Sequence, residues 1–375
     1  MGHTADFIVI GGGIAGASVA AELAQHASVL LLEQEAQPGY HASGRSAALF
    51  SETYGNAVVR ALSTASRAFL AAPPEGFSDA PLLTPRGVLH VGGPDRLDRL
   101  DALCTAVQAL VPATRRLTAQ EVLSRVPALR PEAAAGGVLE PDAMDIETNA
   151  LLQGCLRLMR RRGGRSVTDA AVTGLRREAG VWRVATAAGG FEAPVVVNAA
   201  GAWADEVARL AGVEPIGLTP LRRTAILFDP PGGTDARHWP LVIDVDETFY
   251  FKPDAGLMLA SPADETPSPP TDAQPDEYDV AVTVDRIETA TTLRIGRIPH
   301  RWAGLRSFVA DRSPVAGFDP TAPGFFWLAG QGGYGFQTAP ALARTAAALA
   351  LGGDIPADVA AIGLSAARLS PGRLR

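Results

Sequence analysis

The first residues that point to a chemistry are three glycines, Gly11, Gly13 and Gly16, which have the spacing Gly-x-Gly-x-x-Gly. An apolar run over 6–10 precedes them and a helical pattern follows, so we expect a strand, a tight turn and a helix. Backbone N–H groups in such a turn, together with the helix N-terminus, favour a pyrophosphate. A second apolar run, over 28–32, ends in Glu33, whose carboxylate can bind both ribose hydroxyls of an adenosine and would repel a 2′-phosphate. A glycine-rich turn alone would show the same spacing, but strand, helix and acid together predict a dinucleotide site that disfavours NADP.

Two arginines could provide the second half of a site. Arg223 stands at the start of an alternating β pattern, and Arg306 ends the segment that returns to the nucleotide-binding part of the chain. A guanidinium matches a carboxylate through two hydrogen bonds, which would fix the position of a substrate Cα. In a chain with 32 arginines and a single lysine, an arginine taken alone is more often part of a surface ion pair.

Composition excludes several classes of function. The chain has 375 residues, 47% of them hydrophobic and 19% charged, which suggests about two domains with a large core. A net charge of −7 argues against nucleic acid and anionic membranes as partners. The apolar runs are shorter than a membrane span requires, so we expect a cytoplasmic protein without such a span. Two cysteines and six histidines show no ligand spacing, and we expect no metal site.

The periodicity of the first two thirds of the chain alternates between helix and strand. We expect helices over 57–70, 95–110, 150–161 and 203–211, and strands over 88–91, 138–139, 165–170, 172–176, 181–186 and 195–198. The strand over 195–198 ends in small residues, which would let a ligand lie close to the backbone. A tightly packed strand–helix corner would explain the same small residues equally well.

The last third combines a β-rich region with a return to the nucleotide-binding pattern. Strands are expected over 222–228, 248–252, 257–260 and 279–284, and the Pro- and Asp-rich stretch 262–275 reads as a mobile surface loop. A strand over 325–329, a glycine-rich loop over 330–337 and a helix from Thr338 to Gly352 follow. We therefore predict an α/β (α+β) fold, with a Rossmann-like domain of residues 1–86, 142–216 and 306–375. An inserted antiparallel-sheet substrate domain would comprise residues 87–141 and 217–305.

Five segments in order, 37–48, 198–203, 249–254, 302–308 and 331–335, resemble the D-amino-acid oxidase superfamily of FAD enzymes over nearly the whole chain. Within it the sequence is most similar to bacterial D-arginine dehydrogenases. The resemblance implies bound FAD, held noncovalently because no cysteine follows Cys155. The cofactor-binding residues that it implies are Gly11, Gly13, Ile14, Ala15, Gly16, Glu33, Gln34, Ser43, Arg45, Ser46, Ala48, Val172, Gly201, Trp203, Gly330, Gly332, Gly333, Tyr334, Gly335, Phe336 and Gln337.

The same resemblance implies a reaction. Arg306 and Arg223 would bind the carboxylate of an amino acid, and Tyr54, Tyr250 and the Gly333 carbonyl would orient its amine. A D-amino acid would lose a hydride from Cα to flavin N5, and the imino acid would hydrolyse to a 2-oxo acid and ammonia. Taken singly, the two tyrosines could equally be core aromatics with a solvated hydroxyl.

Two departures from D-arginine dehydrogenases concern the substrate side chain. Val88 stands where those enzymes have a glutamate, and Leu49 stands where they have a histidine. A buried cation without a carboxylate is costly, so we expect neutral or apolar amino acids to be preferred over basic ones.

Sarcosine-oxidase-like relatives place a lysine over the flavin, and Met258 stands at that place here. Lys252 would lie about 20 Å away on the same extended strand, so a dehydrogenase is favoured over an oxidase and the electron acceptor stays open. The alternatives are a glycine or secondary-amine oxidase that uses O2, and a flavoprotein that carries FAD without turnover.

Overall fold

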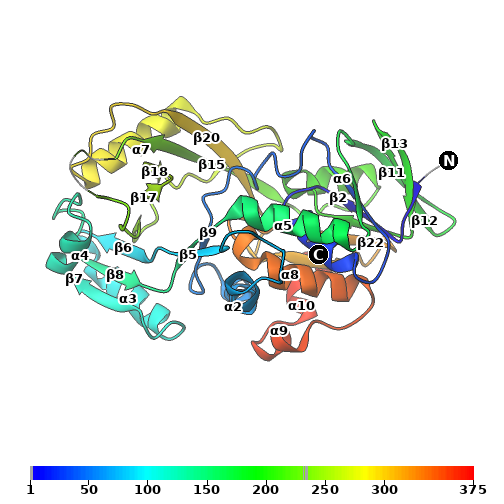
Figure 1. The fold of residues 1–375 in the computed structure, drawn as a ribbon, viewed down its shortest axis with the longest axis horizontal. Coiled ribbons are helices and arrows are strands. Elements are labelled where there is room, and N and C mark those ends of the chain that lie inside the picture. Colours follow the sequence, from blue (N-terminus) through cyan, green and yellow to red (C-terminus); the bar gives the residue numbers. More distant parts are fainter. Residues whose placement is uncertain (1–2, 231, 233–234) are drawn as a thin grey trace.

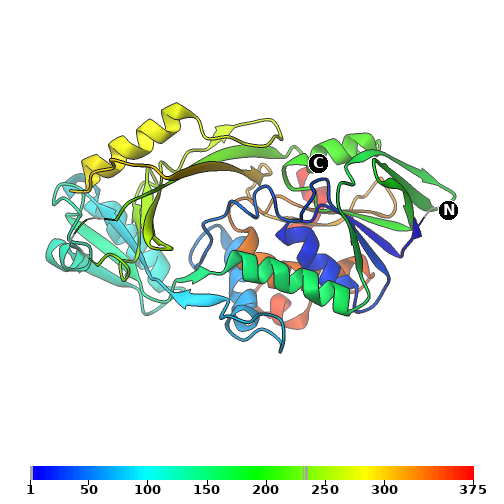
Figure 2. The same cartoon turned by 45° about the horizontal axis from the view of Figure 1, so that its top comes forward.

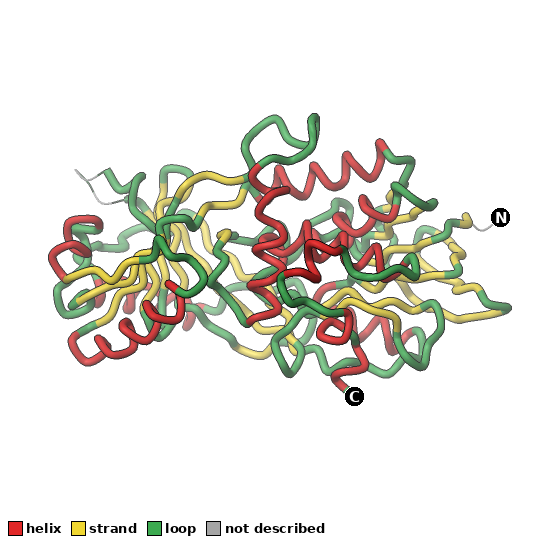
Figure 3. The backbone as a smooth tube through the Cα atoms, turned by 90° about the horizontal axis from the view of Figure 1, so that it is seen from below, coloured by secondary structure: helices red, strands yellow, loops and turns green. Residues whose placement is uncertain are grey.

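The computed structural model describes residues 3–230, 232 and 235–375, and the chain forms two lobes that lie side by side (Figure 1). Each lobe is built around a β-sheet with helices packed beside it (Figure 3). Both the amino and the carboxyl end belong to the same lobe, so the chain leaves this lobe and returns to it.

A six-stranded sheet forms the centre of the lobe that contains both ends. Its order is β10 (Arg165–Val167), β3 (Val29–Leu32), β2 (Phe7–Ile10), β14 (Val195–Asn198), β22 (Phe325–Ala329) and β21 (Val315–Phe318). The first five strands are parallel and β21 is antiparallel to β22. Every residue of β2, β3 and β22 is buried, as expected for parallel strands covered on both faces.

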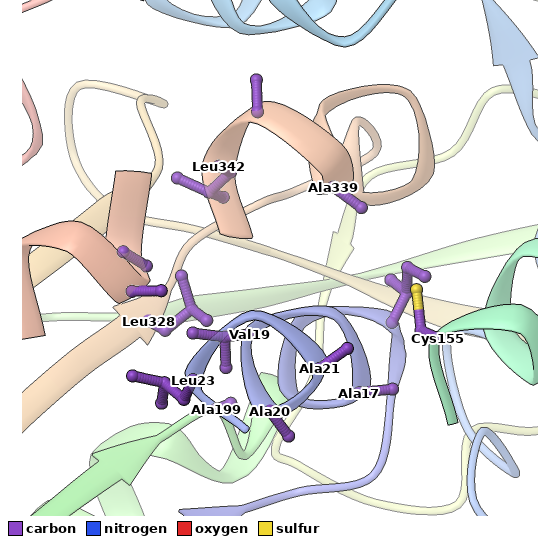
Figure 4. Packing of buried hydrophobic residues seen from close by; sticks show 14 of the residues in the cluster. Ala17, Val19, Ala20, Ala21, Leu23, Cys155, Ala199, Leu328, Ala339 and Leu342 are labelled. Atoms are coloured by element: carbon purple, nitrogen blue, oxygen red, sulfur yellow. The ribbon is translucent and has the colours of Figure 1, made fainter. Parts of the chain in front are cut away.

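Three helices cover one face of this sheet: α1 (Ile14–Leu23), α5 (Thr148–Arg161) and α8 (Gly335–Ala350). Small side chains of α1, among them Ala17 and Ala21, lie between Cys155 of α5 and Ala339 of α8 (Figure 4). Because these side chains are short, three helices can meet closely behind the glycine turn. The other face carries α6 (Ala204–Leu210) and a second sheet of β1 (His3–Thr4), β13 (Gly189–Ala193), β12 (Val181–Thr186) and β11 (Val172–Glu178).

The other lobe is built on one long mixed sheet. The strands run in the order β19 (Thr266–Pro267), β15 (Thr219–Phe228), β18 (Leu257–Ser261), β17 (Tyr250–Asp254), β16 (Leu241–Asp244), β6 (Val88–Gly92), β8 (Gly136–Glu140) and β7 (Arg115–Thr118), and β20 (His300–Phe308) pairs with β15. All neighbours are antiparallel except β16 and β6. The long strands β15 and β20 reach from this lobe towards the other (Figure 2).

Helices α4 (Ala119–Arg125) and α7 (Glu277–Ala290) pack on one face of this sheet, and α3 (Leu97–Gln108) packs on the opposite face. The remaining elements are β4 (Leu49–Phe50), β9 (Met144–Ile146) and β5 (Leu83–Pro85), which form a small sheet, and the helices α2 (Ala57–Ala71), α9 (Ala357–Ala361) and α10 (Ala366–Leu369). Single 3₁₀ turns cover Pro94–Arg96, Gly201–Trp203 and Pro371–Leu374.

The predicted fold class is confirmed, but the strand expected over 279–284 is wrong because these residues lie within α7. The β-branched residues there alternate as in a strand, yet the buried positions Val280, Thr283 and Ile287 have helical spacing. Asp276 caps the helix by accepting a hydrogen bond from the Tyr278 N–H.

Helix α8 begins at Gly335, three residues before the predicted start at Thr338, so part of the expected loop is its first turn. The stretch 262–275 includes the short strand β19 and contacts both lobes, because Asp264 accepts a hydrogen bond from the Thr224 N–H and Asp272 from Arg45.

The prediction that Lys252 and Met258 lie on one extended strand, about 20 Å apart, is wrong as well. The two residues lie on β17 and β18, neighbouring antiparallel strands in which Pro253 is paired with Met258. Met258 is fully buried in the core beneath α7, whereas Lys252 faces the other lobe. The division of the sequence into two domains at residues 86, 141, 216 and 305 stays a proposal.

Candidate cofactor and substrate site

A cavity of about 630 Å³ lies where the two lobes meet, and residues of both lobes line it. Glu33, which directly follows β3, and Val172 at the start of β11 line it, as do Gly13, Gly333 and Arg306. All predicted substrate and catalytic residues line this cavity: Leu49, Tyr54, Val88, Arg223, Tyr250, Arg306 and Gly333. The predicted cofactor residues line it too, with three exceptions, Gly16, Gly330 and Gln337.

The glycine turn is shaped by close backbone contacts. Gly11 has φ of +107°, and a Cβ there would lie 2.4 Å from the Ala199 carbonyl oxygen. A Cβ on Gly16 would lie 1.8 Å from the Gly11 carbonyl oxygen, so Gly16 allows helix α1 to pack on the turn and does not itself face the cavity. The Ile14 N–H donates to Ser43 Oγ at 2.9 Å, which joins the loop after β3 to the start of α1.

Glu33 marks the other side of this turn. Its carboxylate is 7% exposed and accepts hydrogen bonds from the N–H groups of Gly12, at 2.7 Å, and Glu35, at 2.9 Å. Burial raises the pKa of Glu33, although both of these backbone hydrogen bonds oppose the shift. The carboxylate is thereby fixed at the wall, with acceptor sites left for the ribose hydroxyls of an adenosine.

Arg45 lines the cavity, but its guanidinium points to the lobe of the large sheet. It donates to the carbonyl oxygens of Ala273, at 2.8 Å, and Ala303, at 3.1 Å, and forms an ion pair with Asp272. The Arg45 carbonyl accepts a hydrogen bond from Trp302 Nε1 at 2.9 Å. Arg45 therefore holds the two lobes together beside the predicted cofactor site.

The second glycine loop closes the cavity at the start of α8. Gly332 has φ of +55°, and a Cβ there would lie 2.1 Å from the Phe308 ring, so a larger residue would be strained. Two amide nitrogens beside this loop, Nε2 of Gln331 and of Gln337, are buried and have no partner within the described residues. The helix N-terminus and the unpaired amide of Gln331, which lines the cavity, fit the acceptor-rich edge of a flavin. With Glu33 also lining the cavity, the residues present fit FAD.

Arg306 is surrounded by aromatic hydroxyls next to this loop. A Cβ on Gly333 would lie 2.9 Å from the Arg306 guanidinium, which places the guanidinium against the Gly333 backbone. Burial alone would lower the pKa of Arg306, but Tyr54 and Tyr250 outweigh it and raise the pKa. Arg306 forms no ion pair with any described carboxylate, so its charge is available to a ligand.

The neighbouring tyrosines respond to this charge. Burial would raise the pKa of Tyr250, but the charges of Arg306 and Arg223 lower it overall. Burial and Tyr54 raise the pKa of Tyr334 to about 12, and the rings of Tyr54 and Tyr334 meet edge to face with centroids 4.9 Å apart. The raised pKa keeps the Tyr334 hydroxyl protonated, so that it can donate to an anion.

Arg223 lies on β15 and is partly engaged by the 262–275 stretch. Its Nε donates to the Asp264 carbonyl at 2.7 Å, and its Nη2 lies 3.4 Å from Glu265. Glu265 also pairs with Arg312, at 2.7 Å. Arg223 and Arg306 face the same cavity, so both predicted arginines come together, with Arg306 the less committed of the two.

Val88 and Leu49 belong to an apolar cluster of the wall, together with Leu241, Ile243, Ala143 and Tyr250. The cavity wall nevertheless carries a carboxylate that positions 88 and 49 do not reveal, because Glu140 also lines it. Glu140 is directly opposite Val88 in the β6–β8 pair, and residues opposite each other project to the same face. Position 88 alone does not reveal this neighbour, because Glu140 is 52 positions away in the chain.

Lys252 also lines the cavity, but its ammonium is held in an ion pair. Its ammonium is 2.6 Å from the Asp145 carboxylate, which also pairs with Arg86 at 2.6 Å. The Lys252 side chain is only 7% exposed. The ion pair joins the large sheet to β9 and leaves the ammonium engaged with protein.

The fold and the site define a class of protein, a flavoprotein whose cavity lies between the lobe with the glycine turn and the lobe with the long mixed sheet. The model of the FAD dependent oxidoreductase family matches residues 6–349, and the chain belongs to this family. It is thus a FAD-dependent oxidoreductase. Within the described residues, no helix is both long and apolar enough to span a membrane.

Three relatives show how widely this fold is used. Glycerol-3-phosphate dehydrogenase 1 of Mycobacterium tuberculosis is 26% identical over 335 residues, and the match covers 82% of this chain but 64% of that protein. Among solved structures, glycine oxidase from Geobacillus kaustophilus has a TM-score of 0.81 at 23% identity and covers 97% and 99% of the two chains. L-alpha-glycerophosphate oxidase from Mycoplasma pneumoniae, with FAD bound, has a TM-score of 0.83 at 20% identity and covers 93% and 95%. The finer resemblance to D-arginine dehydrogenases is not supported, because the named relatives are these other enzymes.

Proposed function

We propose that the protein oxidises a D-α-amino acid to its imino acid with bound FAD as the electron acceptor. The observation that carries the proposal is Arg306, a partly buried guanidinium that faces the cavity without a carboxylate partner in the described chain. Tyr54 and Tyr250 add hydroxyl donors beside it. Guanidinium and hydroxyl donors that converge on one point suit a substrate carboxylate.

Each of these residues has a part in positioning the substrate. Arg306 and Arg223 bind the carboxylate, and Tyr54 and Tyr250 donate hydrogen bonds to it. The Gly333 carbonyl, adjacent to Arg306, accepts a hydrogen bond from the α-amine and so fixes the orientation of Cα. FAD supplies hydride acceptance at flavin N5, and the imino acid that leaves is hydrolysed by water to a 2-oxo acid and ammonia. The protein contributes by orienting the substrate and not by abstracting a proton from it, so no side chain is required as a strong base.

The electron acceptor for reoxidation is proposed not to be oxygen. Met258 is buried in the core on the far side of the sheet, and Lys252 is engaged by Asp145. This arrangement offers no free lysine cation from β17 or β18 and supports a dehydrogenase. The D configuration and the noncovalent attachment of FAD rest on the sequence resemblance to the D-amino-acid oxidase superfamily. In addition, neither cysteine lines the cavity, and burial raises the pKa of Cys155 to about 12.

Anaerobic mixing of the FAD-loaded protein with a panel of compounds tests the substrate class. The panel contains D- and L-amino acids, glycine, sarcosine, 2-hydroxy acids and glycerol 3-phosphate, and loss of flavin absorbance is followed in each case. We expect bleaching with D-amino acids and none with the hydroxy compounds. Faster bleaching with glycine or sarcosine would favour the amine-oxidase alternative, and bleaching with glycerol 3-phosphate alone would refute the proposal.

A flavoprotein that merely carries FAD would not bleach with any member of the panel. Where wild type does bleach, Arg306→Met tests whether the reaction depends on the proposed carboxylate site, and Arg301→Met is a matched control on the same strand. Arg301 is exposed and pairs with Glu277 at 2.7 Å, away from the cavity. In an enzyme, only the Arg306 variant loses substrate-dependent bleaching.

A further inference from the structure

Glu140, the last residue of β8, is a buried carboxylate on the cavity wall that the proposed reaction does not use. It is 3% exposed. Its oxygens accept hydrogen bonds from Ser51 Oγ, at 3.0 and 3.1 Å, and from Thr53 Oγ1, at 2.6 Å. No arginine, lysine or histidine among the described residues forms an ion pair with it. Burial raises the pKa of Glu140, and the hydroxyl groups oppose the shift.

Hydroxyl groups alone do not saturate this carboxylate. Two carboxylate oxygens offer about four acceptor sites, and Ser51 and Thr53 can each donate one proton. A buried charge without a cation is unfavourable, and a donor from a ligand would satisfy the acceptor sites that remain. Glu140, Ser51 and Thr53 all line that cavity, which makes the remaining acceptor sites reachable by a ligand.

The position of Glu140 relates it to the substrate site. Its Cα is paired with Val88 on β6, and Val88 is paired with Leu241 on β16, so the carboxylate lies next to the apolar wall. The Ser51 N–H donates to Gln337 Oε1 at 3.3 Å, which connects the hydroxyl pair to the first turn of α8. An elongated ligand can therefore have an anionic end at Arg306, an apolar middle along Val88 and a donor group at Glu140.

We propose that Glu140, supported by Ser51 and Thr53, binds a cationic group at the end of the substrate side chain, an ammonium or a guanidinium. The proposal rests on the proposed function, because the carboxylate clamp at Arg306 holds the other end of the same substrate. It reverses the preference for neutral side chains that positions 88 and 49 alone suggested. A purely structural carboxylate that anchors the 51–53 segment is the competing explanation.

The test compares D-lysine with D-norleucine, which has the same chain length but lacks the terminal ammonium. For wild type we expect kcat/KM for anaerobic flavin reduction to favour D-lysine at least about tenfold, as a charge-assisted hydrogen bond implies. Glu140→Gln keeps the size and accepts from the same hydroxyls, so it should reduce the D-lysine value about 10- to 100-fold and change the D-norleucine value by less than about threefold. Glu132→Gln, an exposed position in the same lobe, is the matched control.

Equal use of the two amino acids by wild type, or a preference for D-norleucine, would overturn the proposal even if the variant failed to fold. An equal loss for both substrates in Glu140→Gln would assign the residue a structural role and overturn it as well.

Binding of 6-aminohexanoate and hexanoate to the FAD-loaded protein separates this proposal from the proposed function. Both compounds carry a carboxylate for Arg306, neither is an α-amino acid, and flavin absorbance reports their binding. We expect 6-aminohexanoate to bind at least about tenfold more tightly in wild type, and the difference to vanish in Glu140→Gln. This result without reduction by any amino acid would refute the reaction and retain the cation subsite. Equal binding of the two compounds would refute the subsite whatever the reaction proves to be.

Discussion

Replacement of Arg306 by methionine should remove most of the affinity for the transition state and leave the cofactor in place. Arg306 lies against the Gly333 backbone and is hydrogen-bonded to Tyr54, and it has no carboxylate partner among the described residues. Its positive charge is therefore directed at the ligand. Methionine fills a similar volume without a charge or donor, so the substrate carboxylate would be left with Arg223 alone.

The expected loss follows from the burial of this pair. Truncation of one partner of a desolvated, hydrogen-bonded charge pair costs about 2–5 kcal/mol, which corresponds to a decrease of roughly 30- to 5000-fold in kcat/KM. Arg223 cannot replace the missing fork, because Asp264 and Glu265 already engage its guanidinium. Arg306→Lys keeps the charge but not the two-pronged geometry, so its loss should be intermediate.

Stopped-flow measurement of flavin reduction under anaerobic conditions provides the assay, with Arg301→Met as the control. The flavin spectrum before mixing reports whether FAD is still bound. If Arg306→Met retained kcat/KM within about threefold of wild type, the carboxylate would bind elsewhere and the reasoning would be refuted.

Three further predictions concern the cofactor and the stability of the site. Acid precipitation should release all of the yellow colour as FAD, because neither cysteine lines the cavity; colour that remains in the pellet would contradict noncovalent binding. Gly332→Ala should lower the free energy of unfolding by more than about 1 kcal/mol and weaken FAD binding, since a Cβ at φ of +55° would clash with Phe308; an unchanged melting temperature would contradict this. Burial lowers the pKa of His90 from 6.5 to about 4, so the unfolded chain binds more protons in this interval. Stability contributed by neutral His90 above pH 6.5 should be lost as the pH falls towards about 4, and denaturant titrations of His90→Gln should show a smaller loss than wild type.

Local patterns predicted the nucleotide-binding half of the molecule well. The glycine turn, Glu33 and the strand over 325–329 each combine a buried run with residues that follow within a few positions. Such features depend on neighbours in sequence and can be read directly. In α7 the β-branched residues favoured a strand, but burial at helical spacing and the Asp276 cap overrode that local preference.

The part of the cavity wall that belongs to the lobe of the large sheet was harder to predict, because strands distant in sequence form it. Glu140 faces the cavity beside Val88 only because β8 is paired with β6 in one particular register, which the sequence does not reveal. Lys252 and Met258 were placed on one strand, whereas a turn between them reverses the chain and sends the two side chains to different environments. Where strands pair, the number of residues between two positions does not predict the distance between their side chains.

The most direct test of the central claim is a single-turnover reaction between the FAD-loaded protein and matched D and L enantiomers in the absence of oxygen. We expect complete flavin bleaching by the D enantiomer, with one 2-oxo acid and one ammonia formed for each FAD, and negligible bleaching by the L enantiomer. Bleaching by the L enantiomer alone, or reduction without formation of a 2-oxo acid, would contradict the claim.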